Sequence, residues 1–338
     1  MKKLLTLLLL AAMAMLVMAP ALAEGDEIVF GYISPGPDTW YLRAAEGFEW
    51  ACEKLGVRCI TVNSDRDSNK ELSNIEYLIN EGVAGIGTLS FNESGVVTCA
   101  QMCDEAGIGC VVLDACGAVL KNEVKHTASV DFDWANLGVM NAEWMAEAYP
   151  GENYVIITGT FDSVACQVLD EAMNARAEEL GQNKLIDIRA GEYNPNVAAD
   201  VAEDLVNADL DFSLIFVMNE DMAAAVITRL EDIGVADQYH VLAQNGSDVG
   251  LDFLRMGSLE FTTASSPGWE GVVGALAMYN ILYEGGEGNV QIMCPCAAIT
   301  EQNIDDPYTV IPWDVKANEE IITKLTCDYF PDYAHYFE

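Results

Sequence analysis

Short apolar runs alternate along the chain with longer runs in which apolar positions recur every three or four residues. The short runs have the composition of buried strands, and the longer ones have the period of helices that bury one face. In the first part of the chain the strand runs are residues 28–33, 57–62, 85–89 and 110–114. The helical runs between them are 41–55, 68–81 and 94–106, and each is followed by a glycine, which commonly ends a helix.

The same alternation restarts after a turn-rich stretch at 121–127. The second series has helical runs at 132–149, 164–180, 195–207 and 221–232, and strand runs at 154–158, 185–190, 214–218 and 241–244. Strand, helix, strand in this order predicts parallel sheets with helices on both faces. Two such series therefore predict an α/β protein with two lobes.

The first 23 residues have the pattern of a secretory signal peptide. Two lysines are followed by an apolar stretch, and Ala21 and Ala23 give small residues at alternate positions before Glu24. We expect cleavage after Ala23 and a periplasmic or extracellular location. The first cysteine of the chain is Cys52, so we expect no lipid anchor at the new N-terminus.

The net charge excludes one class of partner. Removal of Lys2 and Lys3 leaves 14 basic residues against 54 acidic ones, a formal charge of −40. Such a field repels phosphate backbones, so we expect no nucleic-acid partner. The acidic residues are spread along the chain, which is typical of solvated faces.

Two cysteine pairs recur at the same place in the predicted repeat. Cys52 with Cys59, and Cys103 with Cys110, each join the last turn of a helix to the start of the next strand. An oxidising compartment permits disulfides there, and a buried free thiol that packs as a small apolar side chain is the alternative. The spacing is not that of a zinc site, and we expect no metal or cofactor.

Polar and aromatic residues gather where the predicted strands end. Ligands of parallel α/β sheets bind beyond the carboxyl ends of the strands. The segments at these ends are 34–41, 90–92, residue 114, 159–167, 192–193, 219–220 and 244–245. Their carboxylates, amides and aromatic rings suit a polyhydroxyl ligand, because oxygens share hydrogen bonds with hydroxyls and rings stack on a sugar face.

At this point the chain resembles the type I periplasmic binding proteins, in the ribose- and galactose-binding branch that serves ABC transporters. The resemblance runs from about residue 28 to about residue 304. It lies in the aromatic pair Trp40-Tyr41 and in the runs 45–49, 69–76, 106–114, 216–223 and 298–304.

The resemblance implies two Rossmann-like lobes joined by a three-strand hinge, with crossings near 121–127, 265–266 and 293–298. We assign 24–127 plus 267–293 to the N-terminal lobe and 128–266 plus 294–338, including a C-terminal extension, to the other. The implied ligand-binding residues are Trp40, Tyr41, Asp114, Gln167, Asn219, Asn245 and Ser265, and the acidic first segment adds Asp38.

The chain departs from the family pattern where sugar binders often carry arginine. Ala115 and Gln167 occupy those two positions, and Asn245 and Ser265 replace an aspartate and a glutamine. The resemblance implies an ABC transporter's solute-binding protein, a monomer that delivers a small polar ligand, a monosaccharide or related carbohydrate, to permease subunits. The departures leave an amino-bearing ligand open, and the same clamp could serve a chemoreceptor or kinase instead.

An enzyme is the competing class. His126, His240 and His335 are scattered, and none stands beside a serine or cysteine as a catalytic triad requires. The prolines of 34–37 remove backbone donors that a phosphate-binding loop needs. We therefore expect a binding protein without catalysis.

Overall fold

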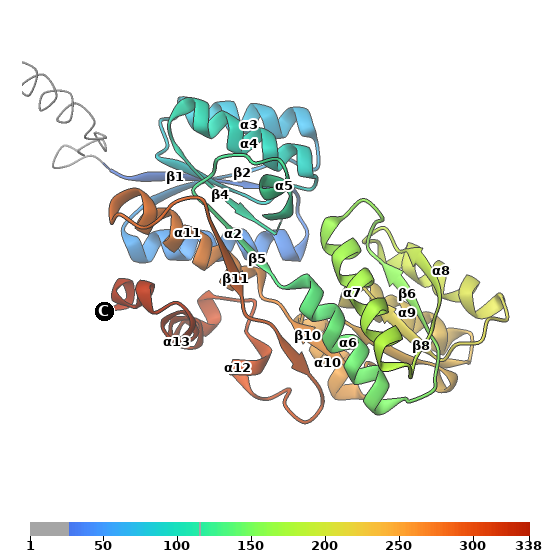
Figure 1. The fold of residues 1–338 in the computed structure, drawn as a ribbon. Coiled ribbons are helices and arrows are strands. Elements are labelled where there is room, and N and C mark those ends of the chain that lie inside the picture. The colour runs from blue at the N-terminus through green and yellow to red at the C-terminus, as the bar shows by residue number, and fades with distance from the viewer. Residues whose placement is uncertain (1–26, 115) are drawn as a thin grey trace, which may run out of the picture.

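The computed structural model describes residues 27–114 and 116–338, so the expected signal peptide lies outside the described residues. Two α/β lobes lie side by side (Figure 1). Among the described residues, no helix is both long and apolar enough to cross a membrane.

The first lobe is built on six parallel strands in the order β11-β5-β4-β3-β1-β2. They are β1 (Val29–Ser34), β2 (Arg58–Asn63), β3 (Gly85–Thr88), β4 (Gly109–Leu113), β5 (Ala128–Phe132) and β11 (Val290–Cys294). Helices α3 and α4 cover one face and α2 and α11 the other (Figure 1). The helices are α2 (Thr39–Leu55), α3 (Ser68–Asn80), α4 (Glu93–Ala106), α5 (Cys116–Lys121) and α11 (Pro267–Tyr283).

The second lobe has four parallel strands in the order β7-β6-β8-β9, with α6 packed on α7 and α8 on α9. The strands are β6 (Tyr154–Thr158), β7 (Leu185–Ala190), β8 (Leu214–Val217) and β9 (His240–Ala243). The helices are α6 (Trp134–Ala148), α7 (Val164–Leu180), α8 (Pro195–Asn207), α9 (Glu220–Asp232), the short η1 (Ala236–Gln238) and α10 (Asp248–Met256). The short pair β10 (Thr262–Ala264) and β12 (Ala297–Ile299) is antiparallel and lies beside β9.

Local chemistry fixes the ends of these helices. Gly56, Gly107 and Gly181 adopt left-handed conformations at the C-termini of α2, α4 and α7, as the sequence predicts. At the N-terminus of α3, the Asp67 carboxylate accepts two backbone N–H groups, and at the N-terminus of α7 the Ser163 hydroxyl accepts the backbone N–H of Cys166. These ends set where each strand-to-helix loop begins, and the loops carry the candidate site.

Helices α2 and α11 approach unusually closely because glycines face the partner backbone. A Cβ atom on Gly47 would lie 1.9 Å from the carbonyl oxygen of Gly268, and one on Gly271 would lie 2.1 Å from that of Ala44. Any larger residue there would force the helices apart. This contact fixes the start of α2, where the aromatic pair of the candidate site lies.

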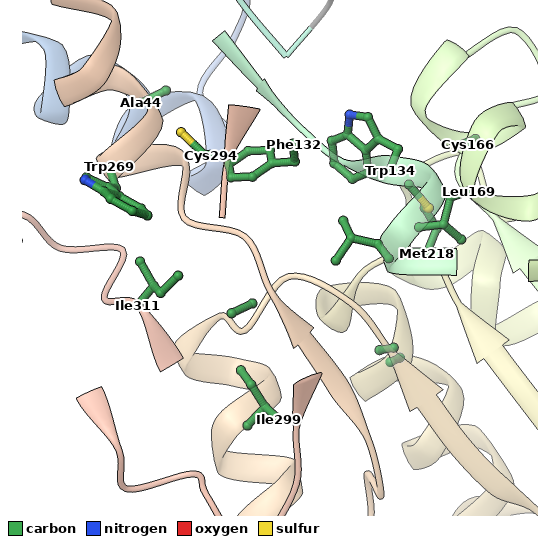
Figure 2. Close-up of a cluster of buried hydrophobic side chains, with 14 of the residues drawn as sticks. Ala44, Phe132, Trp134, Cys166, Leu169, Met218, Trp269, Cys294, Ile299 and Ile311 are labelled. Atoms are coloured by element: carbon green, nitrogen blue, oxygen red, sulfur yellow. The ribbon is translucent and has the colours of Figure 1, made fainter. Parts of the chain in front are cut away.

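The chain crosses between the lobes after β5, between β10 and α11, and between β11 and β12. The first crossing corrects our expectation of a boundary at 127. Residues Ala128–Phe132 form a strand that pairs with β4 and β11, so the first lobe extends to Phe132. In Figure 2, Phe132 and Trp134 lie at this crossing between Cys294 on one side and Leu169 on the other, within one hydrophobic core.

The C-terminal extension also lies elsewhere than we expected. It contains α12 (Pro307–Val310), η2 (Lys316–Asn318), α13 (Glu319–Tyr329) and η3 (Pro331–Phe337). From about residue 313 it packs on the first lobe rather than the second, beneath α2 and α11 (Figure 1). The physical reason is aromatic burial, since Trp50 and Trp269 of the first lobe find ring partners there.

Candidate functional site

Strained backbone marks the ends of the strands in both lobes. Asp114 follows β4 with φ 53°, Tyr193 follows β7 with φ 48°, and Asn245 follows β9 with φ 134°. Arg66, after β2, also has a positive φ of 56°. Such non-glycine conformations cost on the order of 1–3 kcal/mol each and tend to gather at functional sites. These four residues lie at the edge that the sequence predicts for ligand binding, whereas Glu123, Asp209, Asn289 and Ile311 have positive φ angles in other loops.

Carboxyl groups form the floor of the site in the first lobe. The backbone N–H of Asp114 donates to Glu270 Oε1 at 2.7 Å, which brings the two acidic side chains together. Asp114 Oδ1 and Glu270 Oε2 are buried without a hydrogen-bond partner. Burial raises the pKa of both groups well above the ordinary range, and nearby Asp131 raises it further. Buried oxygens without a protein partner commonly bond to water or to a ligand.

Aromatic rings make the wall beside this floor, at the start of α2. Trp40 lies edge-on to Phe132, with ring centroids 5.9 Å apart, and its buried indole N–H faces the Asp114 carboxyl closely enough to lower that pKa in part. The Arg66 guanidinium lies 5.8 Å from the centroid of the Tyr41 ring. The predicted pair Trp40-Tyr41 is thus brought to the predicted Asp114.

Arg66 lies beside the predicted residues Asp38 and Tyr41, although the sequence did not single it out. Its Nη2 forms an ion pair with Asp38 Oδ2 at 2.7 Å, and both side chains are nearly half exposed. Asp38 precedes α2 without capping it through its side chain. A cation therefore stands at this rim, contributed by the loop after β2 and not by either position where the family pattern has arginine.

Tyr193 supplies an aromatic ring from the second lobe. Its ring covers the backbone of Gly159, where a Cβ atom would lie 2.2 Å from Tyr193 Cζ, and its hydroxyl lies 3.0 Å from Cys166 Sγ. Desolvation of the hydroxyl raises its pKa, although 38% of the residue stays exposed. The sequence places Tyr193 in a segment at the end of a predicted strand, but it does not predict the positive φ angle of this residue.

The strand ends of the two lobes face each other. The charge of Asp114 in the first lobe contributes to the raised pKa of Tyr193 in the second. Burial first and the charge of Asp38 second raise the pKa of Asp221 in the same way. Gly117 of α5 also lies against Val164 of α7, with 3.4 Å between its added Cβ position and Val164 Cγ1. The lobes therefore stand close together across the site.

Three predicted residues of the second lobe have local hydrogen bonds. Asn219 Oδ1 accepts the backbone N–H of Met222 at 2.9 Å and so caps α9. Asn245 Oδ1 accepts from Gln244 Nε2 and, at 3.4 Å, from Ser265 Oγ, so the predicted Asn245 and Ser265 do meet. Both are buried, and they lie at the hinge side of the site.

The remaining predicted residue, Gln167, is held away from this cluster. It is exposed on α7, and its Nε2 donates to the carbonyl oxygen of Phe161 at 2.6 Å. Its amide thus braces the loop between β6 and α7. A direct part in ligand binding stays a prediction, as it does for the other seven residues.

All nine cysteines whose side chains the structure describes are free thiols, including Cys52, Cys59, Cys103 and Cys110. The sulfurs of Cys103 and Cys110 lie within 4.8 Å of each other and of Cys99, all three buried. The two predicted disulfides stay predictions, and Cys99 is a neighbour that the sequence reasoning did not include.

Comparisons with known proteins agree with this architecture. Residues 30–287 match the model of the periplasmic binding protein domain. The ribose import binding protein of Salmonella typhimurium is 25% identical over 275 residues, which cover 81% of this chain and 90% of that protein. The protein of the same name from Bacillus subtilis is 22% identical, covering 72% of this chain and 78% of that one.

Solved structures give the same fold at lower identity. An ABC transporter solute-binding protein from Bacillus halodurans, with bound myo-inositol, has a TM-score of 0.76 and 19% identity over 85% of this chain and 98% of its own. A solute-binding protein from Burkholderia graminis in complex with D-arabinose has a TM-score of 0.76 and 17% identity, covering 84% and 99%. With the family model matched over most of its length, this chain belongs to the periplasmic binding protein family.

Proposed function

We propose that this protein is the extracytoplasmic solute-binding component of an ABC importer and that it holds a monosaccharide or related carbohydrate between its lobes. The observation that supports this best is the meeting of unpartnered carboxyl oxygens and aromatic rings where the strand ends of two lobes face each other. The relatives named for ribose import, and the solved neighbours with inositol and arabinose, support the same ligand class.

The residues divide into two kinds of contact. Asp114 and Glu270 offer oxygens to ligand hydroxyls, and a protonated carboxyl of the pair can donate as well as accept. Trp40 and Tyr41 from one lobe, with Tyr193 from the other, offer ring faces to the apolar side of a sugar. A site that binds a pyranose or furanose ring needs both kinds of contact, polar groups for the hydroxyls and flat aromatic faces for the apolar side of the ring.

The action is binding and closure without chemistry. A ligand that contacts both lobes stabilises the arrangement in which their strand ends face each other, and so shifts the population toward it. The closed form would then dock on the permease subunits. The expected signal peptide and the family support an exchange outside the cytoplasm, and we propose that the binding protein acts as a monomer.

A thermal unfolding panel on residues 24–338 tests the ligand class. It contains pentoses, hexoses, inositols, amino sugars and polyamines. A ligand that binds only the folded state adds about 2.7 kcal/mol at a hundredfold excess over its dissociation constant, which raises Tm by several degrees. Stabilisation by neutral sugars supports the proposal. Stabilisation by cationic compounds alone, or by nothing in the panel, contradicts it.

A further inference from the structure

The C-terminal extension reaches the candidate site as well as the back of the first lobe. It lies outside the matched region 30–287. Its later part is fastened to α2 and α11: Trp50 stacks on Phe337 at 5.9 Å between centroids, and Trp269 Nε1 donates to Thr326 Oγ1 at 3.0 Å. The extension is therefore a fixed part of the fold, and its residues 312–315 pass the hinge.

Trp313 contacts both lobes at that hinge. Its ring lies edge-on to Trp40 of the first lobe, with 5.3 Å between centroids and an interplanar angle of 85°. Its Nε1 donates to the backbone carbonyl of Asn245, at the end of β9 in the second lobe, at 3.3 Å. Both partners are among the residues that we assign to the ligand site.

The backbone on either side of Trp313 is anchored. Ser266 Oγ donates to the carbonyl oxygen of Pro312 at 2.8 Å. A Cβ atom on Gly268 would lie 2.2 Å from the carbonyl oxygen of Trp313, so the chain passes in direct contact with the start of α11. Arg43 Nη1 pairs with Asp314 Oδ2 at 3.0 Å. These contacts hold the indole in one place against Trp40.

We propose that Trp313 is a positioning residue of the ligand site, which holds the Trp40 ring and the strained Asn245 backbone in their binding orientations. This inference rests on the proposed function, because it concerns the same site. Without the Trp313 ring, Trp40 keeps Phe132 as its edge-on partner on one side only. Without the indole N–H, the Asn245 carbonyl keeps only the backbone N–H of Ser265, at 2.9 Å, as its donor.

Two variants separate the ring from the N–H group. Trp313→Phe keeps an aromatic face for Trp40 and removes the donor, whereas Trp313→Ala removes both. An aromatic contact and a neutral hydrogen bond each contribute about fivefold in affinity. We expect the dissociation constant of the best sugar of the panel to rise about fivefold in Trp313→Phe and about 25-fold in Trp313→Ala. The control is Trp144→Phe, in the second lobe, where Trp144 stacks on Phe261.

A second measurement needs no ligand. Two indoles at 5.3 Å couple electronically, so the near-ultraviolet circular dichroism of Trp40→Phe, Trp313→Phe and the double variant should be non-additive. Trp144→Phe combined with Trp40→Phe should be additive. Non-additive spectra together with graded loss of affinity support the inference.

Additive spectra, or wild-type affinity in Trp313→Ala, would overturn it. If the wild type binds no sugar at all, the proposed function fails on its own, and the ligand-free spectra still decide whether Trp313 holds Trp40.

Discussion

The buried carboxyl group of Asp170 destabilises the folded state by an amount that depends on pH. It lies on α7, 8% exposed, and its Oδ1 has no hydrogen-bond partner. Burial raises the pKa of Asp170 from 3.8 to about 7, against a smaller opposing effect of the Thr158 hydroxyl. The substitution Asp170→Asn keeps the shape of the side chain and removes the charge, so it isolates this cost.

The sign follows from the raised pKa. Well below pH 3.8 the carboxyl is protonated in both the folded and the unfolded chain, and its burial then has no electrostatic cost. As the pH rises from 4 to 7 the unfolded chain ionises first, so folding loses stability until the folded group ionises too. Each pKa unit corresponds to 1.36 kcal/mol, so burial of this carboxyl lowers the free energy of unfolding by about 1.6 kcal/mol at pH 5 and about 4 kcal/mol at pH 8.

Urea unfolding of wild type and Asp170→Asn at pH 5 and pH 8 measures this difference. We expect the gain in free energy of unfolding to be about 2–3 kcal/mol larger at pH 8 than at pH 5. The control is Asp232→Asn, at an exposed position at the end of α9, which should change stability little at either pH. An equal gain at both pH values in Asp170→Asn would refute the reasoning.

Three further substitutions test other parts of the structure. Glu220 accepts two backbone N–H groups of the loop after β9, so Glu220→Ala should lower the free energy of unfolding by about 2–3 kcal/mol and weaken sugar binding. Urea titration measures the stability and calorimetry measures the affinity, and an unchanged stability and affinity would contradict the prediction. A Cβ atom on Gly138 would lie 2.3 Å from the Leu169 carbonyl oxygen, so Gly138→Ala should lower the free energy of unfolding by about 1–3 kcal/mol. A Tm equal to that of the wild type would mean that the contact between α6 and α7 accommodates the added methyl group. If the Cys103–Cys110 bridge forms in the exported protein, Cys103→Ser should raise the number of thiols titrated after denaturation without reductant; a lower count in the variant would mean that no bridge was there.

The parallel strands could be predicted because they are continuous apolar runs, and the helices because their apolar positions recur at helical spacing. Strands β5 and β11 were the exceptions. The sequence of β5, Ala-Ser-Val-Asp-Phe, places Asp131 in the sheet between β11 and β4, where its carboxylate accepts the Trp134 indole N–H at 2.7 Å. A charged residue within a short run resembles a turn in the sequence, and only the pairing with β4 and β11 identifies a strand.

The candidate site could be predicted only in outline. Trp40 and Asp114 lie at strand ends, and the rule for parallel sheets finds such positions. Arg66 and Tyr193 take part through the positive φ angles of their loops, which no hydrophobic pattern reveals. Trp313 comes from an extension beyond the repeating pattern, so its meeting with Trp40 depends on where that extension docks.

The most direct test of the account is calorimetric titration of residues 24–338 with the best sugar of the panel, for wild type, Asp114→Gly and Asp232→Asn. Glycine suits the left-handed backbone at residue 114, so the substitution removes the carboxyl without adding strain. We predict one site per chain in wild type and Asp232→Asn, and an affinity roughly 10- to 100-fold lower in Asp114→Gly. Wild-type affinity in a folded Asp114→Gly variant would contradict the claim that the sugar binds at the facing strand ends.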